Sequence, residues 1–317
     1  MSVGENKITA LHPVPGIRMA SVAAGIKKQE RNDVVLFEIS QQATIAGIYT
    51  KNAFCAAPVI LTKKHMSQAK PRYFLINTGN ANAGTGEKGI EDALSCCNKV
   101  VQLTGVDANT VLTFSTGVIG EFLPVEKIKK VLGEAVKSLN DDAWLEAAMA
   151  IMTTDTRPKA VSYQIPYEDR FITITGIAKG AGMLKPNMAT MLAYIFTDAN
   201  IEKNYLQTLL EQFADKSFNR ITVDGDTSTN DCCMLVASAA SDIEITKSSP
   251  VSVEFIVCLE RVFVELAKGL IRDAEGASKF ITIKVEEGKT SEESLNVAYA
   301  VAESPLVKTA LFASDPN

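Results

Sequence analysis

A threonine, Thr190, lies in the middle of an apolar run, Met-Ala-Thr-Met-Leu at residues 188–192, shortly after a Lys-Gly-Ala-Gly turn at residues 179–182. Threonine is common in strands because its branched side chain packs well there, but its hydroxyl also acts as a nucleophile where a base activates it. The two histidines, His12 and His65, both lie in the first quarter of the chain, and the basic, polar stretch around His65 favours a solvated side chain. A Ser-His-Asp or Cys-His arrangement therefore has little support, and a catalytic base would have to be a group other than histidine.

Five stretches interrupt the secondary-structure pattern and combine glycine with threonine, asparagine or serine at the ends of predicted strands. They are NTGNANAGTGEKG (77–89), STGVIG (115–120), TTDT (153–156), KGAG with the following MAT (179–190) and FNRITVDGDTSTND (218–231). Such loops present backbone N–H groups and hydroxyls toward one point, which suits the binding of a carbonyl oxygen, a carboxylate or a phosphate. Each stretch alone is also typical of an ordinary turn.

None of these stretches has the spacing of a known nucleotide or metal loop. GTGEKG lacks the order of a P-loop, and KGAGMLKPNMAT lacks the glycine spacing of a dinucleotide-binding turn. The acidic stretch at 218–231 lacks the calcium-loop spacing with its closing glutamate, which favours a structural or solvated loop. The six cysteines include no C-x-x-C pair and lie far from the histidines, so we expect no metal site and mostly buried thiols.

Composition places the chain among ordinary globular proteins. It has 317 residues, of which 46% are hydrophobic and 22% charged, enough for a large core. The net charge of −5, from 32 basic and 37 acidic residues, gives no electrostatic footprint for a nucleic acid or an anionic membrane, so we expect neither as a partner. No apolar run is long enough to span a membrane and the first residues lack the order of a signal peptide, which predicts a cytoplasmic protein.

Strands and helices alternate along the sequence. β-branched and aromatic residues predict strands at 33–39, 43–50, 72–79, 110–120, 162–180, 189–199, 232–240 and 279–288. Apolar residues at spacings of three and four predict helices at 89–105, 124–140, 141–153, 204–219 and 252–273. The strands outnumber those of a simple crossover scheme, so the pattern indicates an α/β protein whose helices flank mixed or antiparallel sheets.

Seven motifs together, in the same order along the chain, resemble those of the ornithine acetyltransferases, the ArgJ family. They are NTGNANAGTGEKG, STGVIG, IMTTDT, KGAGMLKPNMATML, FNRITVDGDTSTND, RDAEGASKF and SPLVKTALF. The resemblance covers essentially the whole chain and implies a layered αββα-like sandwich of the ArgJ/DmpA type. In that family the precursor cleaves itself before the threonine of MATML, and the new N-terminal threonine is the nucleophile. The resemblance therefore implies a cut between Ala189 and Thr190, which divides the chain into an alpha chain of residues 1–189 and a beta chain of residues 190–317.

The implied cut would also supply the missing base. It gives Thr190 an α-amine whose pKa is about 7.7–8.0, so that a useful fraction is neutral near neutral pH and can take the proton of the hydroxyl. The resemblance further implies that Thr116 and Gly117 form the oxyanion hole, with a side-chain hydroxyl and a backbone N–H. The substrate-contacting positions of the family match Thr153, Lys179, Thr190 and Glu275. A cation and an anion in one pocket complement the carboxylate and the ammonium of an amino acid.

Resemblance to this family implies a two-step acetyl transfer in arginine biosynthesis. Thr190 takes the acetyl group from N-acetylornithine, ornithine leaves, and glutamate then accepts the acetyl group to form N-acetylglutamate. Some members of the family also use acetyl-CoA as the donor, and the sequence does not distinguish the two types; no other cofactor is expected. The resemblance also implies a heterotetramer of two alpha and two beta chains.

The family's chain continues past the residues that match Leu-Phe-Ala-Ser-Asp-Pro-Asn, typically with Trp-Gly-Arg and roughly 80 further residues. We therefore expect a C-terminal segment of the pocket to be absent from the sequence that ends at Asn317, as in a fragment or a truncated copy. Two other interpretations stay open. One is an amidase or aminopeptidase with an N-terminal nucleophile, in which water accepts the acyl group. The other is a non-catalytic truncated remnant that binds a small amino acid or has a structural role.

Overall fold

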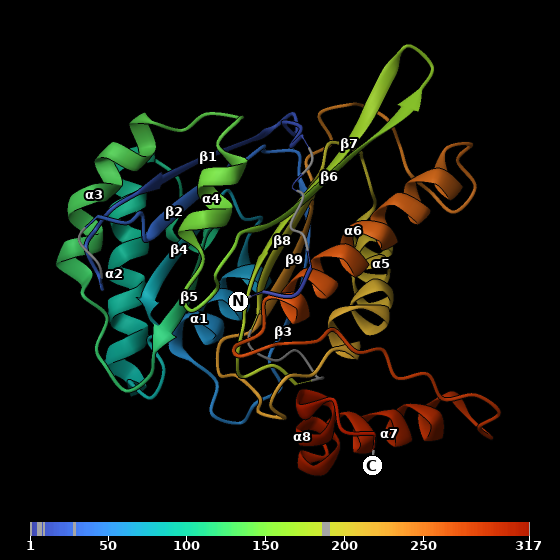
Figure 1. Ribbon diagram of the computed structural model, residues 1–317. Coiled ribbons are helices and arrows are strands. Elements are labelled where there is room, and N and C mark those ends of the chain that lie inside the picture. Colours follow the sequence, from blue (N-terminus) through green and yellow to red (C-terminus); the bar gives the residue numbers. More distant parts are fainter. Residues whose placement is uncertain (1, 5–7, 9, 28–29, 186–190, 317) are drawn as a thin grey trace.

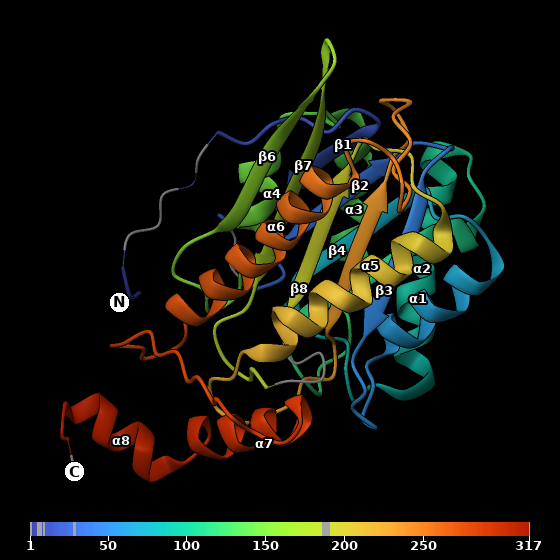
Figure 2. The ribbon, with the colours of Figure 1, turned by 90° about the vertical axis from the view of Figure 1, so that its right-hand side faces the viewer.

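In the residues that the structure describes, two β-sheets lie face to face and helices cover the outer face of each (Figure 1, Figure 2). The structure is a computed structural model and describes residues 2–4, 8, 10–27, 30–185 and 191–316. The first sheet has the strand order β1 (Ile17–Val22), β2 (Val34–Ile39), β4 (Tyr73–Asn80) and β5 (Val111–Val118). The second has the order β3 (Thr44–Tyr49), β9 (Cys232–Ala237), β8 (Leu192–Thr197), β7 (Arg170–Lys179) and β6 (Lys159–Tyr167). The pairs β4–β5 and β8–β9 are parallel and the other pairs antiparallel, so both sheets are mixed.

Aromatic side chains fill the space between the two sheets. Phe37 of β2 stacks on Phe196 of β8 with ring centroids 5.0 Å apart, and Phe114 of β5 meets Tyr194 of β8 edge-on at 5.3 Å. All six residues of β8 are buried, because this strand has the first sheet on one face and helices on the other. Since β8 begins at Leu192, the central core fixes the chain directly after the predicted cut.

Helices form the two outer layers of the sandwich. The first sheet is covered by α1 (Ala57–Gln68), α2 (Gly86–Thr104) and α3 (Val125–Lys137), and the second by α5 (Lys203–Lys216) and α6 (Ser252–Arg272). Along α6 the buried apolar residues recur at spacings of three and four, as in Phe255, Leu259, Val262, Leu266 and Leu270. The two sheets with helices on both outer faces confirm the layered αββα sandwich that the resemblance implied.

Within the described ranges no helix combines the length and the apolar character that a membrane span requires.

Most predicted elements are present at the expected places. Apart from the stretches 162–180 and 279–288, all the predicted helices and strands match elements of the structure, with small differences at their ends. The stretch 162–180, predicted as one strand, belongs to a hairpin of β6 and β7, whose turn contains Glu168 with a φ of 54°. The short helix α4 (Trp144–Ala150) lies at the edge of the sandwich and inserts Trp144 into the core between the sheets. The patterns did not predict β1 or α1.

The strand predicted at 279–288 is wrong. Its apolar residues alternate, but a strand also needs a neighbouring strand for its backbone N–H and C=O groups, and no described strand pairs with this segment. The segment instead leads to α7 (Ser291–Ala302) and α8 (Pro305–Ala313), two helices that were not predicted. Neither helix buries a residue in the described part of the chain, and Figure 2 shows both outside the layered body.

The fold predicts a strong contrast between two apolar truncations. Phe196→Ala, in the fully buried β8, should lower the free energy of unfolding by about 3–5 kcal/mol, because it leaves a cavity between the sheets. Leu306→Ala, in α8, should change it by less than about 0.5 kcal/mol, because that side chain is 78% exposed. Urea denaturation followed by circular dichroism measures both values, and equal losses would contradict the assignment of the core.

Candidate active site

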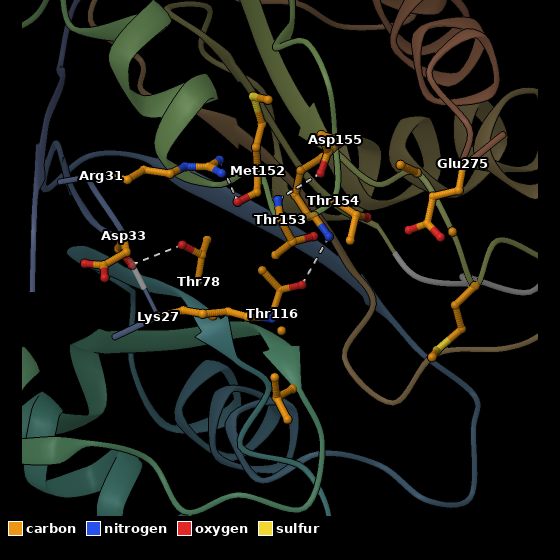
Figure 3. Close-up of a pocket in the computed structure, with 17 residues that line it drawn as sticks. Lys27, Arg31, Asp33, Thr78, Thr116, Met152, Thr153, Thr154, Asp155 and Glu275 are labelled. Carbon is orange, nitrogen blue, oxygen red and sulfur yellow. Dashed lines mark hydrogen bonds between the residues drawn. The ribbon is translucent and has the colours of Figure 1, made fainter. Parts of the chain in front are cut away.

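A cavity of about 800 Å3 lies where β4, β5 and β7 end (Figure 3). Its lining consists of Lys27, Arg31, Asp33, Thr78, Gly79, Thr116, Gly117, Val118, Met152, Thr153, Thr154, Asp155, Lys179, Ala181, Gly182, Met183 and Glu275. The sequence-predicted site residues among them are Thr116, Gly117, Thr153, Lys179 and Glu275. The structure thus brings together all of the predicted site residues that it describes. Ala189 and Thr190 lie outside the described residues.

Thr116 and Gly117 stand near the end of β5, where they pair with Thr78 and Gly79 of β4. Gly117 has a φ of +138°, and a Cβ there would lie 2.3 Å from the carbonyl carbon of Gly79. Only glycine fits this position, because any side chain would collide with the backbone of β4. The Nζ of Lys179 donates a hydrogen bond of 3.2 Å to the Oγ1 of Thr116, and both side chains are buried.

Lys179 is a buried lysine that lines the cavity and is 3% exposed. Burial lowers the pKa of Lys179, the nearby cation Lys159 lowers it further, and the carboxylates of Asp155, Asp231 and Glu275 oppose the shift. One buried lysine and the acidic side chains of Asp155, Asp231 and Glu275 together make a strongly polar centre in a low-dielectric surrounding. Such a centre is typical of a functional site.

Asp155 holds two of the predicted site segments together. Its Oδ2 accepts the backbone N–H of Thr153 at 3.0 Å, and its Oδ1 accepts the N–H of Gly180 at 2.7 Å. Burial alone would raise the pKa of Asp155, but the charges of Lys179 and Lys159 and the hydrogen bonds from Lys159 and the Gly180 N–H lower it to about 2. The sequence analysis quoted TTDT without giving its aspartate a role, because the role depends on a contact with a strand that follows later in the chain.

Glu275 reaches the cavity across the KGAG turn. Its backbone N–H donates to the carbonyl oxygen of Ala181 at 2.7 Å, which holds the start of the segment after α6 against the turn. A Cβ on Gly182 would lie 2.9 Å from the carboxyl carbon of Glu275. The second glycine of the motif therefore makes room for the carboxylate, which stands on the opposite side of the cavity from Thr116 in Figure 3.

The acidic loop at 218–231 binds backbone groups on both sides of residues 186–190. Asp224 accepts the N–H groups of Met183 at 2.5 Å and Leu184 at 2.9 Å, and the Oδ1 of Asp231 accepts the N–H of Met191 at 2.7 Å. Asp231 is 1% exposed, and burial raises its pKa well above the ordinary value against the influence of the Met191 amide, Lys179 and Ser228. Its Oδ2 accepts no hydrogen bond within the described part of the chain. These carboxylates thus act as hydrogen-bond acceptors that position the chain next to the predicted cut.

The wall opposite the KGAG turn comes from the segment before β2, which the sequence analysis did not identify. Arg31 donates through Nη2 to the carbonyl oxygens of Met149 at 2.9 Å and Met152 at 2.8 Å (Figure 3). Asp33 is buried and accepts the N–H groups of Ala24 and Ile26, each at 2.6 Å. No motif marks this segment, so only the three-dimensional structure reveals it.

Other parts of the motifs are structural. Asn77 accepts a hydrogen bond of 2.6 Å from Ser115, and Asn230 donates to the carbonyl oxygens of Ser115 and Ala81 at 2.9 and 2.7 Å, which holds β5 in place next to Thr116. The expectation of a solvated His65 is wrong: the side chain is 4% exposed, and its Nδ1 lies 2.8 Å from the carbonyl oxygen of Val111, at the far end of β5 from the cavity.

Comparisons with known proteins find a family model and relatives that match this chain. The sequence profile of the ArgJ family matches residues 18–317. A protein named arginine biosynthesis bifunctional protein ArgJ, from Pseudomonas syringae pv. tomato, is 54% identical over 100% of this chain and 78% of that protein. A protein of the same name from Pseudomonas fluorescens is 52% identical, again over 100% of this chain and 78% of that protein.

A solved structure is similar as well. Ornithine acetyltransferase from Mycobacterium tuberculosis, in complex with ornithine, is 36% identical, covers 55% of this chain and 92% of that chain, and superposes with a TM-score of 0.50. A family profile that spans almost the entire chain, together with relatives more than half identical to it, leads to one conclusion: the chain belongs to the ArgJ family.

Proposed function

We propose that this protein transfers an acetyl group from N-acetylornithine to glutamate through an acetyl ester on Thr190, after a self-cleavage that frees the amine of that residue. The observation that carries the proposal is the convergence of Thr116, Gly117, Lys179 and Glu275 on one cavity. Support also comes from the names of the relatives, which are arginine biosynthesis proteins, and from the similar ornithine acetyltransferase, which holds ornithine.

The charges of the cavity suit a free amino acid. Lys179 offers a cation for an α-carboxylate, Glu275 offers an anion for an α-ammonium group, and Thr153 lines the same cavity. N-acetylornithine and glutamate share the backbone of an α-amino acid, and only the acetylated and the free α-amine distinguish them at the reacting end. One cavity can therefore hold the donor and the acceptor in turn.

The hydrogen bond between Lys179 and Thr116 supports an oxyanion role for the threonine. An ammonium group has donors only, so the Thr116 oxygen accepts in this bond and the hydroxyl proton stays available for another acceptor. A tetrahedral intermediate at Thr190 would offer such an acceptor, a negatively charged oxygen. The N–H of Gly117 is the proposed second donor.

The two products of the cut would stay associated. β7, from the proposed alpha chain, pairs with β8 of the beta chain, and β3 pairs with β9 in the same sheet. A heterotetramer of two copies of each chain, a cytoplasmic location and acetyl-CoA as a second acetyl donor are further proposals, which rest on the family resemblance alone.

The first prediction concerns the cut itself. The purified protein should give two bands on a denaturing gel, and N-terminal sequencing of the smaller product should read Thr-Met-Leu-Ala-Tyr. Thr190→Ala removes the attacking hydroxyl and should remain one chain of 34.1 kDa. An uncut wild-type chain that still transferred acetyl groups would contradict the mechanism.

Thr116→Ala tests the oxyanion hole. Because the hydroxyl acts on charge that develops in the transition state, its loss should lower kcat by about 10²–10³-fold and change KM by less than about threefold. Thr116→Ser is the matched control, since it keeps the hydroxyl, and it should retain kcat within about tenfold. Steady-state kinetics in which Thr116→Ala raised KM alone would move this residue from catalysis to substrate binding.

A third prediction concerns the order of the reaction. Initial rates against N-acetylornithine at several glutamate concentrations should give parallel double-reciprocal lines, because ornithine leaves before glutamate reacts. Without glutamate, mass spectrometry should find one acetyl group on the fragment that begins at Thr190, and none on the Thr190→Ala chain. Intersecting lines without an adduct would indicate direct transfer. Rapid loss of the adduct to water, unaffected by glutamate, would indicate an amidase.

A further inference from the structure

A second buried lysine, Lys159, lies behind the cavity and does not line it. Its Nζ contacts Asp155 Oδ1 at 2.5 Å, Asp273 Oδ2 at 2.6 Å and the carbonyl oxygen of Gly180 at 3.3 Å. The lysine side chain is 2% exposed and both carboxylates are fully buried. Burial of three ionised groups is unfavourable unless each is paired, so the geometry of this cluster is tightly constrained.

Asp155 lies between two lysines and pairs with only one of them. Its hydrogen bonds go to Lys159, to the N–H of Gly180 and to the N–H of Thr153. Within the described residues Asp155 forms no ion pair with Lys179, although the two charges influence each other's pKa. Lys179 donates instead to Thr116.

Asp273 fixes Lys159 in this position. It ends α6 and accepts the backbone N–H of Thr156 at 2.9 Å and that of Arg157 at 3.3 Å, in addition to the bond from Lys159. The charges of the two lysines, Lys159 and Lys179, balance those of the two aspartates. Removal of Lys159 would leave Asp155 as a buried carboxylate whose nearest remaining cation is Lys179.

We propose that Lys159 is a positioning residue for the acetyl transfer: by pairing with Asp155 it leaves Lys179 free to hold Thr116 in the orientation that an oxyanion requires. The inference rests on the proposed function of the cavity and adds a residue that does not touch the substrate. Without Lys159, the Nζ of Lys179 turns to Asp155 and releases Thr116. The site then loses an oriented donor while its shape changes little.

Three variants test the inference, with acetyl transfer by the wild-type protein as the reference. Lys159→Met should lower kcat per cleaved chain by about 30–100-fold and change KM by less than about threefold, because an oriented oxyanion donor acts in the transition state. Lys159→Met combined with Asp155→Asn should be at least about tenfold more active than Lys159→Met alone, because the carboxylate that captures Lys179 is gone. A double variant no more active than the single one would show that Lys159 has a structural role only.

The chain offers a matched control in Lys88→Met. Lys88 and Asp92 form another ion pair four residues apart, but on α2 and away from the cavity, so this variant should keep kcat within about twofold. Lys159→Gln, which removes the positive charge beside Asp155 but keeps a hydrogen-bond donor, decides the question if Lys159→Met does not fold. It should lower kcat by at least about tenfold, and a kcat equal to that of the wild type would overturn the proposal.

A crystal structure of Lys159→Met separates this inference from the proposed function. The Nζ of Lys179 should lie within hydrogen-bond distance of Asp155 and away from Thr116, whether or not the protein transfers acetyl groups. A wild-type protein without acetyl transfer would refute the function only. A Lys179 that stays on Thr116 in the variant would refute the positioning role only.

Discussion

The site depends on the pairing of three neighbouring strands of the second sheet, which places the end of β7 beside the starts of β8 and β9. β8 pairs antiparallel with β7 and parallel with β9, so that Lys179, Leu192 and Cys232 lie side by side. The residues just outside these strands are brought together as a result, and Asp231 therefore reaches the amide of Met191. Since β8 is buried on both faces, a shift of this register by one residue would exchange the side chains of two closely packed core layers. The central core thus holds the lysine, the aspartate and the chain next to the predicted cut in fixed relation.

Local periodicity was enough to predict most of the helices and strands, but not which strands pair with each other. α2 and α6 have apolar residues at helical spacing, so their existence follows from sequence alone. The segment 279–288 has the alternation of a strand, but a strand is stable only beside a partner, and the described chain provides none there. His65 was misjudged for a related reason. Two exposed lysines precede it in sequence, but the unpredicted helix α1 turns His65 to its buried face.

The site was predicted in a different way from the fold. Thr116, Gly117, Thr153, Lys179 and Glu275 were named from a family resemblance, and the structure brings all five to one cavity. Their residue types alone could not have shown this, because the five positions are spread between residues 116 and 275. The supporting residues were missed because their role is a contact and not a pattern. An aspartate in TTDT or TSTND has no local feature that indicates whether it caps a turn, faces solvent or pairs with a buried lysine.

The buried charges raise a question of balance between stability and function. Lys159, Lys179, Asp155, Asp231 and Asp273 are all nearly or fully buried, and well-packed apolar residues in such places often give equal or greater stability. What the charged groups provide is a set of donors and acceptors already oriented before a substrate arrives, in a region where water cannot weaken them. These groups come from both sides of the predicted cut, since Lys179 precedes it and Asp231 and Asp273 follow it. Lys179 ends β7 and Asp231 directly precedes β9, and these two strands flank β8 in one sheet. Asp273 follows α6, which packs on the same sheet. After a break in the covalent chain, this packing and strand pairing would therefore still hold the three groups in place.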